Sequence, residues 1–184
     1  RIDTLAFDPQ SKAFVIIEYK RERNSSVIDQ GFTYLSLMLQ NQADFILEYN
    51  ETQAGNLKRN EVDWSQTKVV FVSQGFTPNQ REAVNFKDLS IELWEVKRYE
   101  NDSVSITPIR KSHASASIKT VMQNSPEFKE VTEKIKEYSE ENLLKGKSDD
   151  VVELYESYKN AILNLNTEIE VKPQKWYVSF KKTN

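Results

Sequence analysis

The chain has 184 residues, which suits one domain of ordinary size or one domain with an appendage. It contains no cysteine, so disulfides, zinc–thiolate sites and thiol nucleophiles are excluded, and this composition is compatible with a reducing cytoplasm. No apolar run approaches the roughly 18 residues of a membrane span. The net charge of −3 is not the profile of a protein that coats nucleic acid.

The chain opens with a predicted β-hairpin whose turn spans residues 8–12. The turn sequence Asp-Pro-Gln-Ser-Lys is rich in residues that favour tight turns, and its proline fixes φ. With the turn centred between Gln10 and Ser11, the numbers of facing residues sum to 21. Asp3 then lies opposite Glu18, with both carboxylates on one face of the ribbon. A slip of one residue would separate the two acids.

The second strand of this hairpin, from Phe14 to Lys20, is an apolar run that ends in Glu-x-Lys. Lys20 shares a face with Glu18 because side chains alternate along a strand. A carboxylate pair at the end of an apolar ribbon is costly unless it is ion-paired or metal-bound. Two carboxylates can hold a hard divalent cation, and a lysine beside them can stabilise phosphate charge or orient a water. The hairpin therefore predicts a metal-dependent phosphodiesterase site.

A polar break at residues 21–25 follows the hairpin and carries Arg21 and Arg23. Residues 1–125 hold 15 basic and 16 acidic side chains, so nucleic acid would need a local basic rim rather than a broadly basic surface. Lys20 and the two arginines are candidates for part of that rim. The alternative is that they belong to an ordinary solvated loop.

Ser26 and Asp29 have the spacing of a capping box and predict the start of a helix. On this helix Gln30 and Tyr34 are four residues apart, so they share one face. Their position directly after the hairpin suggests that they bind phosphate or position a nucleotide. The alternative for Tyr34 is an ordinary core residue.

The remaining elements predict an α/β fold. Thr77 followed by Pro78 predicts a capped helix start. A helical crossover makes the strand after the first helix parallel to the hairpin's second strand. The resulting order β-β-α-β-α-β-β suits a mixed β-sheet flanked by helices. Further strands are predicted at residues 68–73, 91–99 and 104–109, and the helical pattern continues over residues 41–49.

These residues together resemble a known family. Asp3, Glu18-x-Lys20 and Gln30-x-x-x-Tyr34 resemble the PD-(D/E)xK nuclease superfamily, in the RecB-like branch whose fourth motif reads Gln-x-x-x-Tyr. The resemblance covers residues 1–110. It implies a restriction-endonuclease-like fold, shared with tRNA endonucleases, in which a mixed β-sheet is flanked by helices.

Two departures from the family pattern concern the start of the chain. Ile2 stands where the family name has proline, a common departure. The family's N-terminal helix, which often supplies another acidic residue, would precede Arg1 and is expected to be missing here.

The resemblance implies a role for each matching residue. Asp3 and Glu18 would bind Mg²⁺ (or Mn²⁺), helped by the backbone carbonyl of Tyr19, and Lys20 would assist the attacking water. Asp3, Glu18 and Lys20 are thus the expected catalytic residues. The expected substrate contacts are Gln30, Tyr34, Arg21 and Arg23.

Other sequence features argue against competing sites. A second Glu-x-Lys, Glu95 to Lys97, follows no hairpin with an aspartate and precedes no Gln-x-x-x-Tyr, so we expect it to be a solvated strand face. His113 is the single histidine and lies in a Ser-rich segment, which argues against catalytic triads and histidine-metal sites. Glycine-rich nucleotide-binding loops and a Gly-x-Ser-x-Gly elbow are absent.

The composition changes after residue 110. Residues 111–125 are rich in Ser, Ala and Lys and are predicted to be a linker. Residues 126–184 are predicted to be a helical extension, with helices starting at Pro126 and Asp149, and a strand from Lys175 to Phe180. From about Ser148 this tail resembles the opening of a small uncharacterised module appended to such nuclease domains in prokaryotic proteins, and the module would be truncated here.

The sequence therefore predicts a prokaryotic, cytoplasmic, Mg²⁺-dependent (endo)nuclease that acts on DNA. The expected partner is nucleic acid, with no membrane, and homodimerisation is left open. One alternative is a nuclease fold with little or no turnover that binds nucleic acid or protein. Another is a structural domain in which the motif arose by chance. The two carboxylates and the lysine must converge with room for a cation if the nuclease hypothesis is right.

Overall fold

The computed structural model describes residues 2–21, 26–86, 88–112, 138–166 and 168–182. The chain forms two compact units, residues 1–136 and 137–184, which are described in turn. Of the predicted linker, only residues 111 and 112 are described. Both bond to the first unit: Lys111 Nζ donates to the Leu89 carbonyl, and the Ser112 amide donates to Asn85 Oδ1 at 2.7 Å. The helix predicted from Pro126 starts outside the described residues.

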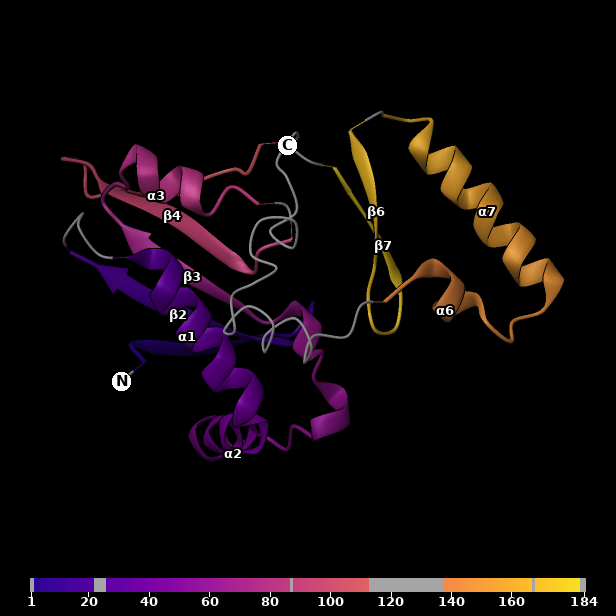
Figure 1. Cartoon of the computed structure of the whole chain (residues 1–184), viewed down its shortest axis with the longest axis horizontal. Coiled ribbons are helices and arrows are strands. Elements are labelled where there is room, and N and C mark those ends of the chain that lie inside the picture. The colour runs from indigo at the N-terminus through magenta and orange to yellow at the C-terminus, as the bar shows by residue number, and fades with distance from the viewer. Residues whose placement is uncertain (1, 22–25, 87, 113–137, 167, 183–184) are drawn as a thin grey trace. The chain divides into compact units, whose positions relative to one another are not determined.

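The first unit is built on a mixed five-stranded sheet in the order β1-β2-β3-β4-β5 (Figure 1). The outer pairs β1–β2 and β4–β5 are antiparallel, and the inner pairs β2–β3 and β3–β4 are parallel. The predicted α/β class, mixed sheet and parallel crossover are confirmed. The strands are β1 (Thr4–Asp8), β2 (Ala13–Lys20), β3 (Lys68–Ser73), β4 (Ile91–Arg98) and β5 (Val104–Pro108).

Three α-helices of this unit begin close to the predicted positions. Ser26 Oγ accepts from the Asp29 amide at the start of α1, and Thr77 Oγ1 accepts from the Gln80 amide at the start of α3, where Pro78 is the first helical residue. These caps satisfy backbone donors that have no partner inside the helix. The helices are α1 (Val27–Gln40), α2 (Gln42–Gln53) and α3 (Pro78–Ala83), with short 3₁₀ turns η1 (Arg59–Glu61) and η2 (Trp64–Gln66).

The predicted register of the first hairpin is confirmed. Thr4 pairs with Ile17 and Phe7 with Phe14, so the numbers of paired residues sum to 21. Asp8 fixes the turn, because its carboxylate accepts from the Gln10 amide at 2.9 Å and from Ser11 Oγ at 2.6 Å. Extending this register by one pair places Asp3 opposite Glu18.

The core lies between α1 and one face of the sheet. The packing is close at Gly31, where an added Cβ would lie 2.9 Å from Cγ1 of the fully buried Ile91 and nearer still to its Cδ1. The largest fully buried side chains on this face and on α1 are Phe14, Ile16, Leu35, Met38, Phe71, Ile91 and Leu93.

The carboxyl ends of the parallel strands meet at one edge of this sheet. Lys20 pairs with Ser73, and Ser73 pairs with Glu95. Paired residues of neighbouring strands share a face, so these three side chains form a row on the face that α1 covers. The same face carries Glu18, two residues before the row.

The second unit combines two helices with a hairpin. The helix predicted at Asp149 is confirmed, but the extension is not purely helical, because its last part is a two-stranded antiparallel sheet. The strand predicted from Lys175 begins later, since residues 174–177 form a turn closed by the Gln174 amide and the Tyr177 carbonyl at 2.7 Å. The elements are α6 (Glu140–Leu144), α7 (Asp149–Leu163), β6 (Ile169–Pro173) and β7 (Val178–Lys182).

Within the described ranges, none of the helices has both the length and the apolar character needed to cross a membrane.

Candidate functional site

Glu18 is the centre of the candidate site. It lies near the carboxyl end of β2 and is only 8% exposed, unusual for a carboxylate at neutral pH. Its Oε1 accepts from Gln30 Nε2 at 3.0 Å and lies 3.5 Å from Lys20 Nζ, while its Oε2 accepts from the Tyr34 hydroxyl at 3.1 Å. Both oxygens therefore have donors, which offsets the cost of burial.

Helix α1 supplies two of these donors from one face, one turn apart. Gln30 also bridges the carboxylate to the lysine, because its Oε1 accepts from Lys20 Nζ while its Nε2 donates to Glu18. The same Nε2 lies 3.0 Å from the Tyr34 hydroxyl. The capped start at Ser26 sets where the helix begins, and hence which residues meet the end of β2.

Tyr34 is held as a neutral donor. Burial, then the negative charges of Glu18 and Asp3, raise its pKa above the ordinary value, against the opposing effect of the hydrogen bond from Gln30. Because a tyrosine with a raised pKa keeps its proton throughout the neutral range, Tyr34 donates to Glu18 at physiological pH.

Asp3 lies just before β1 and is exposed. Its Oδ2 accepts from the Tyr19 amide at 3.0 Å, which ties it to β2 beside Glu18. The Tyr19 side chain is 54% exposed and belongs to the opposite face, so only its backbone faces the site. The sequence analysis expected only the backbone carbonyl of Tyr19, and not its side chain, to bind the metal.

The basic residues of the site differ in their surroundings. The Lys20 side chain is only 14% exposed and its Nζ lies 5.5 Å from the centre of the Phe71 ring. Arg21 is exposed directly after β2. Arg23 and His113 lie outside the described residues. Among the described residues, the basic side chain that contacts Glu18 is thus Lys20, which is held in place rather than solvated.

The oxygen donors of the site suit a hard divalent cation but do not form a closed cage. Among the described residues, no group of three or more Asp, Glu or His side chains comes together. The available donors are the carboxylates of Asp3 and Glu18 and the Tyr19 carbonyl. Mg²⁺ commonly uses one or two carboxylates and completes its shell with water and substrate phosphate, so this donor set fits a magnesium site that opens to a substrate.

A groove of about 1050 Å³ leads away from Asp3 along the outer edge of β1. Its other wall comes from α2 and the end of α1, and Asp44 and Glu48 lie along it. The described lining residues include these three acids and neither lysine nor arginine. The described part of the β1 side of the candidate site is therefore acidic.

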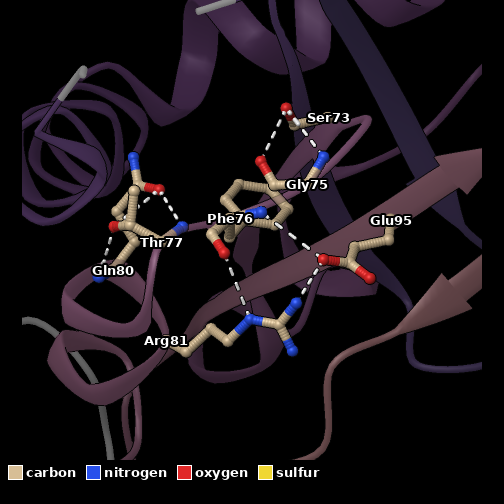
Figure 2. Close-up of polar contacts among 7 residues, drawn as sticks. All are labelled: Ser73, Gly75, Phe76, Thr77, Gln80, Arg81 and Glu95. Carbon is tan, nitrogen blue, oxygen red and sulfur yellow. Dashed lines mark hydrogen bonds and ion pairs between the residues drawn. The ribbon is translucent and has the colours of Figure 1, made fainter. Parts of the chain in front are cut away.

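On the opposite side of the site, the expectation of a solvated Glu95 was wrong. Its side chain is only 18% exposed and forms an ion pair with Arg81 (Figure 2), whereas Lys97 is exposed as expected. The sequence analysis compared the Glu-x-Lys at Glu95 with the one at Glu18. It did not recognise that Glu95 aligns with Lys20 across the sheet, through Ser73. The parallel pairing of β2, β3 and β4 was the signal that could have revealed it.

Comparisons with known proteins give one informative match. The chain is 55% identical over 182 residues to an uncharacterised protein of Haemophilus influenzae. The alignment covers 99% of this chain and 60% of that protein, so the chain spans less than two thirds of its relative's length. No family model matches the chain, and no solved structure matches it.

Proposed function

We propose that the first unit is a metal-dependent nuclease of the PD-(D/E)xK type, with a restriction-endonuclease-like fold, that hydrolyses phosphodiester bonds of DNA. The observation that carries the proposal is the hydrogen-bonded cluster around the buried Glu18. In this cluster the Glu-x-Lys strand meets the Gln-x-x-x-Tyr helix, and the hairpin register brings Asp3 alongside. In this proposal the protein works in the cytoplasm, where DNA and Mg²⁺ are both present.

In the proposed site, Asp3, Glu18 and the Tyr19 carbonyl would hold Mg²⁺ or Mn²⁺. When bound, such a cation neutralises charge on the phosphodiester and makes a nearby water more acidic. The protein's own part is to hold these donors in place, since Gln30 and Tyr34 fix the orientation of both Glu18 oxygens. Outer partners of this kind orient ligands in many metal sites.

Lys20 would supply positive charge at the scissile phosphate. Its ammonium is held between Glu18 and Gln30 and is largely shielded from solvent. Electrostatic interactions are stronger in such a partly dry setting than in water. Lys20 would therefore stabilise the charge that develops on the phosphate oxygens and orient the attacking water.

The test is cleavage of DNA by the purified full-length chain. We expect cutting with Mg²⁺ or Mn²⁺, and binding with little turnover with Ca²⁺, whose coordination is larger and looser. Glu18→Gln and Asp3→Asn should abolish cutting while leaving the fold intact. Lys20→Ala should leave the metal bound and slow cleavage on the order of 10²-fold, the scale of a lost transition-state donor.

The matched control is Glu51→Gln, an exposed position on α2 with the same change of charge. It should cut like the wild type. Activity that survives in Glu18→Gln would point to a contaminating nuclease and count against this site. Failure of the wild type to bind Mn²⁺ would leave the Glu18 cluster as a purely structural buried network.

A binding module without useful turnover is the second candidate, because the described residues provide only two carboxylates. Full-length protein that binds DNA but cleaves neither single-stranded nor double-stranded DNA or RNA with either metal would establish this alternative.

A further inference from the structure

The β3–α3 loop and the end of β4 form a charged cluster beside the proposed catalytic site. Arg81 Nη2 lies 2.5 Å from Glu95 Oε1, and Arg81 Nε donates to the Phe76 carbonyl at 3.3 Å. The Phe76 amide lies 3.4 Å from the same Glu95 oxygen. Figure 2 shows that the arginine reaches from α3 to β4 and closes this network around the loop.

The sheet places this cluster in line with the candidate catalytic lysine. Lys20, Ser73 and Glu95 are register partners on one face of three adjacent strands. Neighbouring strands lie about 4.8 Å apart, so the backbone at Glu95 is about 10 Å from the backbone at Lys20. That span is short enough for one polynucleotide chain to reach both positions.

The distribution of charge favours a DNA path from Lys20 across β3 and β4 over a path along β1. On the β1 side, the described residues that line the groove beside Asp3 include three carboxylates and no basic side chain, and these acids would repel a polyanion. Arg21 is exposed directly after β2, and on the β3–β4 side Arg81 is exposed on α3. A phosphate backbone that enters the site is therefore drawn across the ends of β3 and β4.

The two partners of the Arg81–Glu95 pair differ in exposure. The Glu95 side chain is 18% exposed, whereas the Arg81 side chain is 46% exposed. A guanidinium has five donors in a fixed fork, so it can keep one carboxylate partner and still present N–H groups to a second anion. The buried acid would hold the arginine, and the arginine would face the substrate.

Resting on the proposed nuclease function, we propose that Arg81 is a DNA-binding residue that contacts a backbone phosphate on the β4 side of the scissile bond. Glu95 is a positioning residue that holds the arginine and the β3–α3 loop. The DNA strand runs from Lys20 across the ends of β3 and β4, away from the acidic groove.

The experiment measures binding of a double-stranded DNA oligonucleotide to the full chain in Ca²⁺, at several salt concentrations. Arg81→Gln should raise Kd about tenfold and lower the slope of log K against log salt by about 1, the signature of one lost phosphate contact. Glu95→Gln frees the arginine from its counter-charge and should bind DNA more tightly than wild type. The control is Arg98→Gln, whose arginine is ion-paired to Asp102 at 2.7 Å on the opposite face and should bind as wild type.

The opposite effects of the two main variants separate a DNA contact from a structural ion pair. The proposal would be overturned if Arg81→Gln and Glu95→Gln weakened DNA binding equally. It would also be overturned if the slope of log K against log salt were unchanged in Arg81→Gln. Equal weakening by Arg98→Gln would overturn it too, because it would indicate a general charge effect. Should Arg81→Gln fail to fold by circular dichroism, Glu95→Gln decides alone, and binding no tighter than wild type overturns the proposal. A wild type that binds no DNA contradicts the nuclease function itself, which distinguishes the two failures.

Discussion

At the scale of single residues, the candidate site depends on how a buried carboxylate is hydrogen-bonded and oriented. Glu18 receives hydrogen bonds from α1 on both oxygens and has an ammonium nearby. Such a group is expensive to bury but well ordered once its donors are in place. The sequence predicted Gln30 and Tyr34 as substrate contacts, and this stays a prediction. Their contacts give both of them a second role as partners of Glu18.

Tyr34→Phe tests that second role. The change removes the donor to Glu18 Oε2 and keeps the buried ring, so the carboxylate should lose part of its orientation. We expect Mn²⁺ affinity and DNA cleavage to fall about tenfold or more, the usual effect of losing an outer partner of a metal ligand. Calorimetric titration with Mn²⁺ and single-turnover cleavage measure the two quantities. Tyr49→Phe makes the same chemical change on α2 and should alter neither, whereas unchanged metal affinity in Tyr34→Phe would limit the residue to core packing.

At the scale of elements, the position of α1 on the sheet is set where Gly31 meets Ile91. The helix approaches β4 so closely that no Cβ fits without displacing a side chain that is fully buried. Gly31 directly follows Gln30. The contact between Gly31 and Ile91 therefore also sets how close the face of α1 that carries Gln30 and Tyr34 lies to β2.

Gly31→Ala should therefore destabilise the protein although alanine favours helices. Overpacking costs about 1–3 kcal/mol, and the gain in helix propensity is about 1 kcal/mol, so we expect a net loss of up to about 2 kcal/mol. Urea unfolding measures it. Thr33→Ala, an exposed position on the same helix, is the control and should change stability by less than about 0.5 kcal/mol. A stabilised Gly31→Ala protein would mean that α1 sits farther from the sheet.

In the second unit, α6 is joined to α7 through Glu140. Its Oε2 accepts from the Tyr155 hydroxyl at 2.6 Å and lies 2.5 Å from Lys159 Nζ. The hydrogen bond from Lys159, then that from Tyr155, lower the pKa of Glu140 below its ordinary value, although burial opposes this. A carboxyl group with a lowered pKa in the folded state stabilises the fold above its unfolded pKa, and that stabilisation is lost as the pH falls through the folded pKa.

We therefore expect the second unit to become less stable below about pH 4.5, the ordinary pKa of a glutamate side chain. Thermal unfolding followed by Trp176 fluorescence, in a chain whose Trp64 and Trp94 are replaced by phenylalanine, reports on this unit. Glu140→Gln should lower the melting temperature at pH 7. In this variant the melting temperature should also change less between neutral and acidic pH than in the wild type. Glu141→Gln, at the adjacent exposed position, should keep the wild-type dependence. If the melting temperature of Glu140→Gln falls with pH as much as that of the wild type, other carboxylates cause the loss of stability in acid.

At the scale of the whole molecule, all the described candidate ligands and donors belong to the first unit. Asp3, Glu18, Lys20, Gln30 and Tyr34 lie within the first 34 residues, and Arg81 and Glu95 lie in the same unit. The second unit has its own helices and its own two-stranded sheet. Two such units can carry separate roles.

A chain shortened to residues 1–136 should therefore still bind Mn²⁺ and cut DNA if it folds. Circular dichroism establishes folding, and the Mn²⁺ titration and cleavage assay follow. Retained activity places the whole catalytic apparatus in the first unit. Loss of Mn²⁺ binding by a folded short chain would show that residues 137–184 contribute to the site.

The sequence by itself determined the local structure of the first unit and the pairs of residues that depend on local geometry. The turn at residues 8–12 set the hairpin register, and the capping residues Ser26 and Thr77 set where helices begin, because these features depend on residues a few positions apart. The α/β class followed from the order of the strands and helices.

Only the tertiary structure decided which side chains from distant segments meet. The hydrogen bonds of α1 to Glu18, the row from Lys20 to Glu95 and the ion pair of Glu95 with Arg81 depend on how parallel strands align across the sheet. A single sequence does not reveal that alignment. Parallel strands are joined by long connections, so their register is set by the packing of the helices on the sheet and not by a short turn. For the same reason, Glu95 was expected to be a solvated strand residue, whereas the fold leaves its side chain only 18% exposed, beside the proposed path of the substrate.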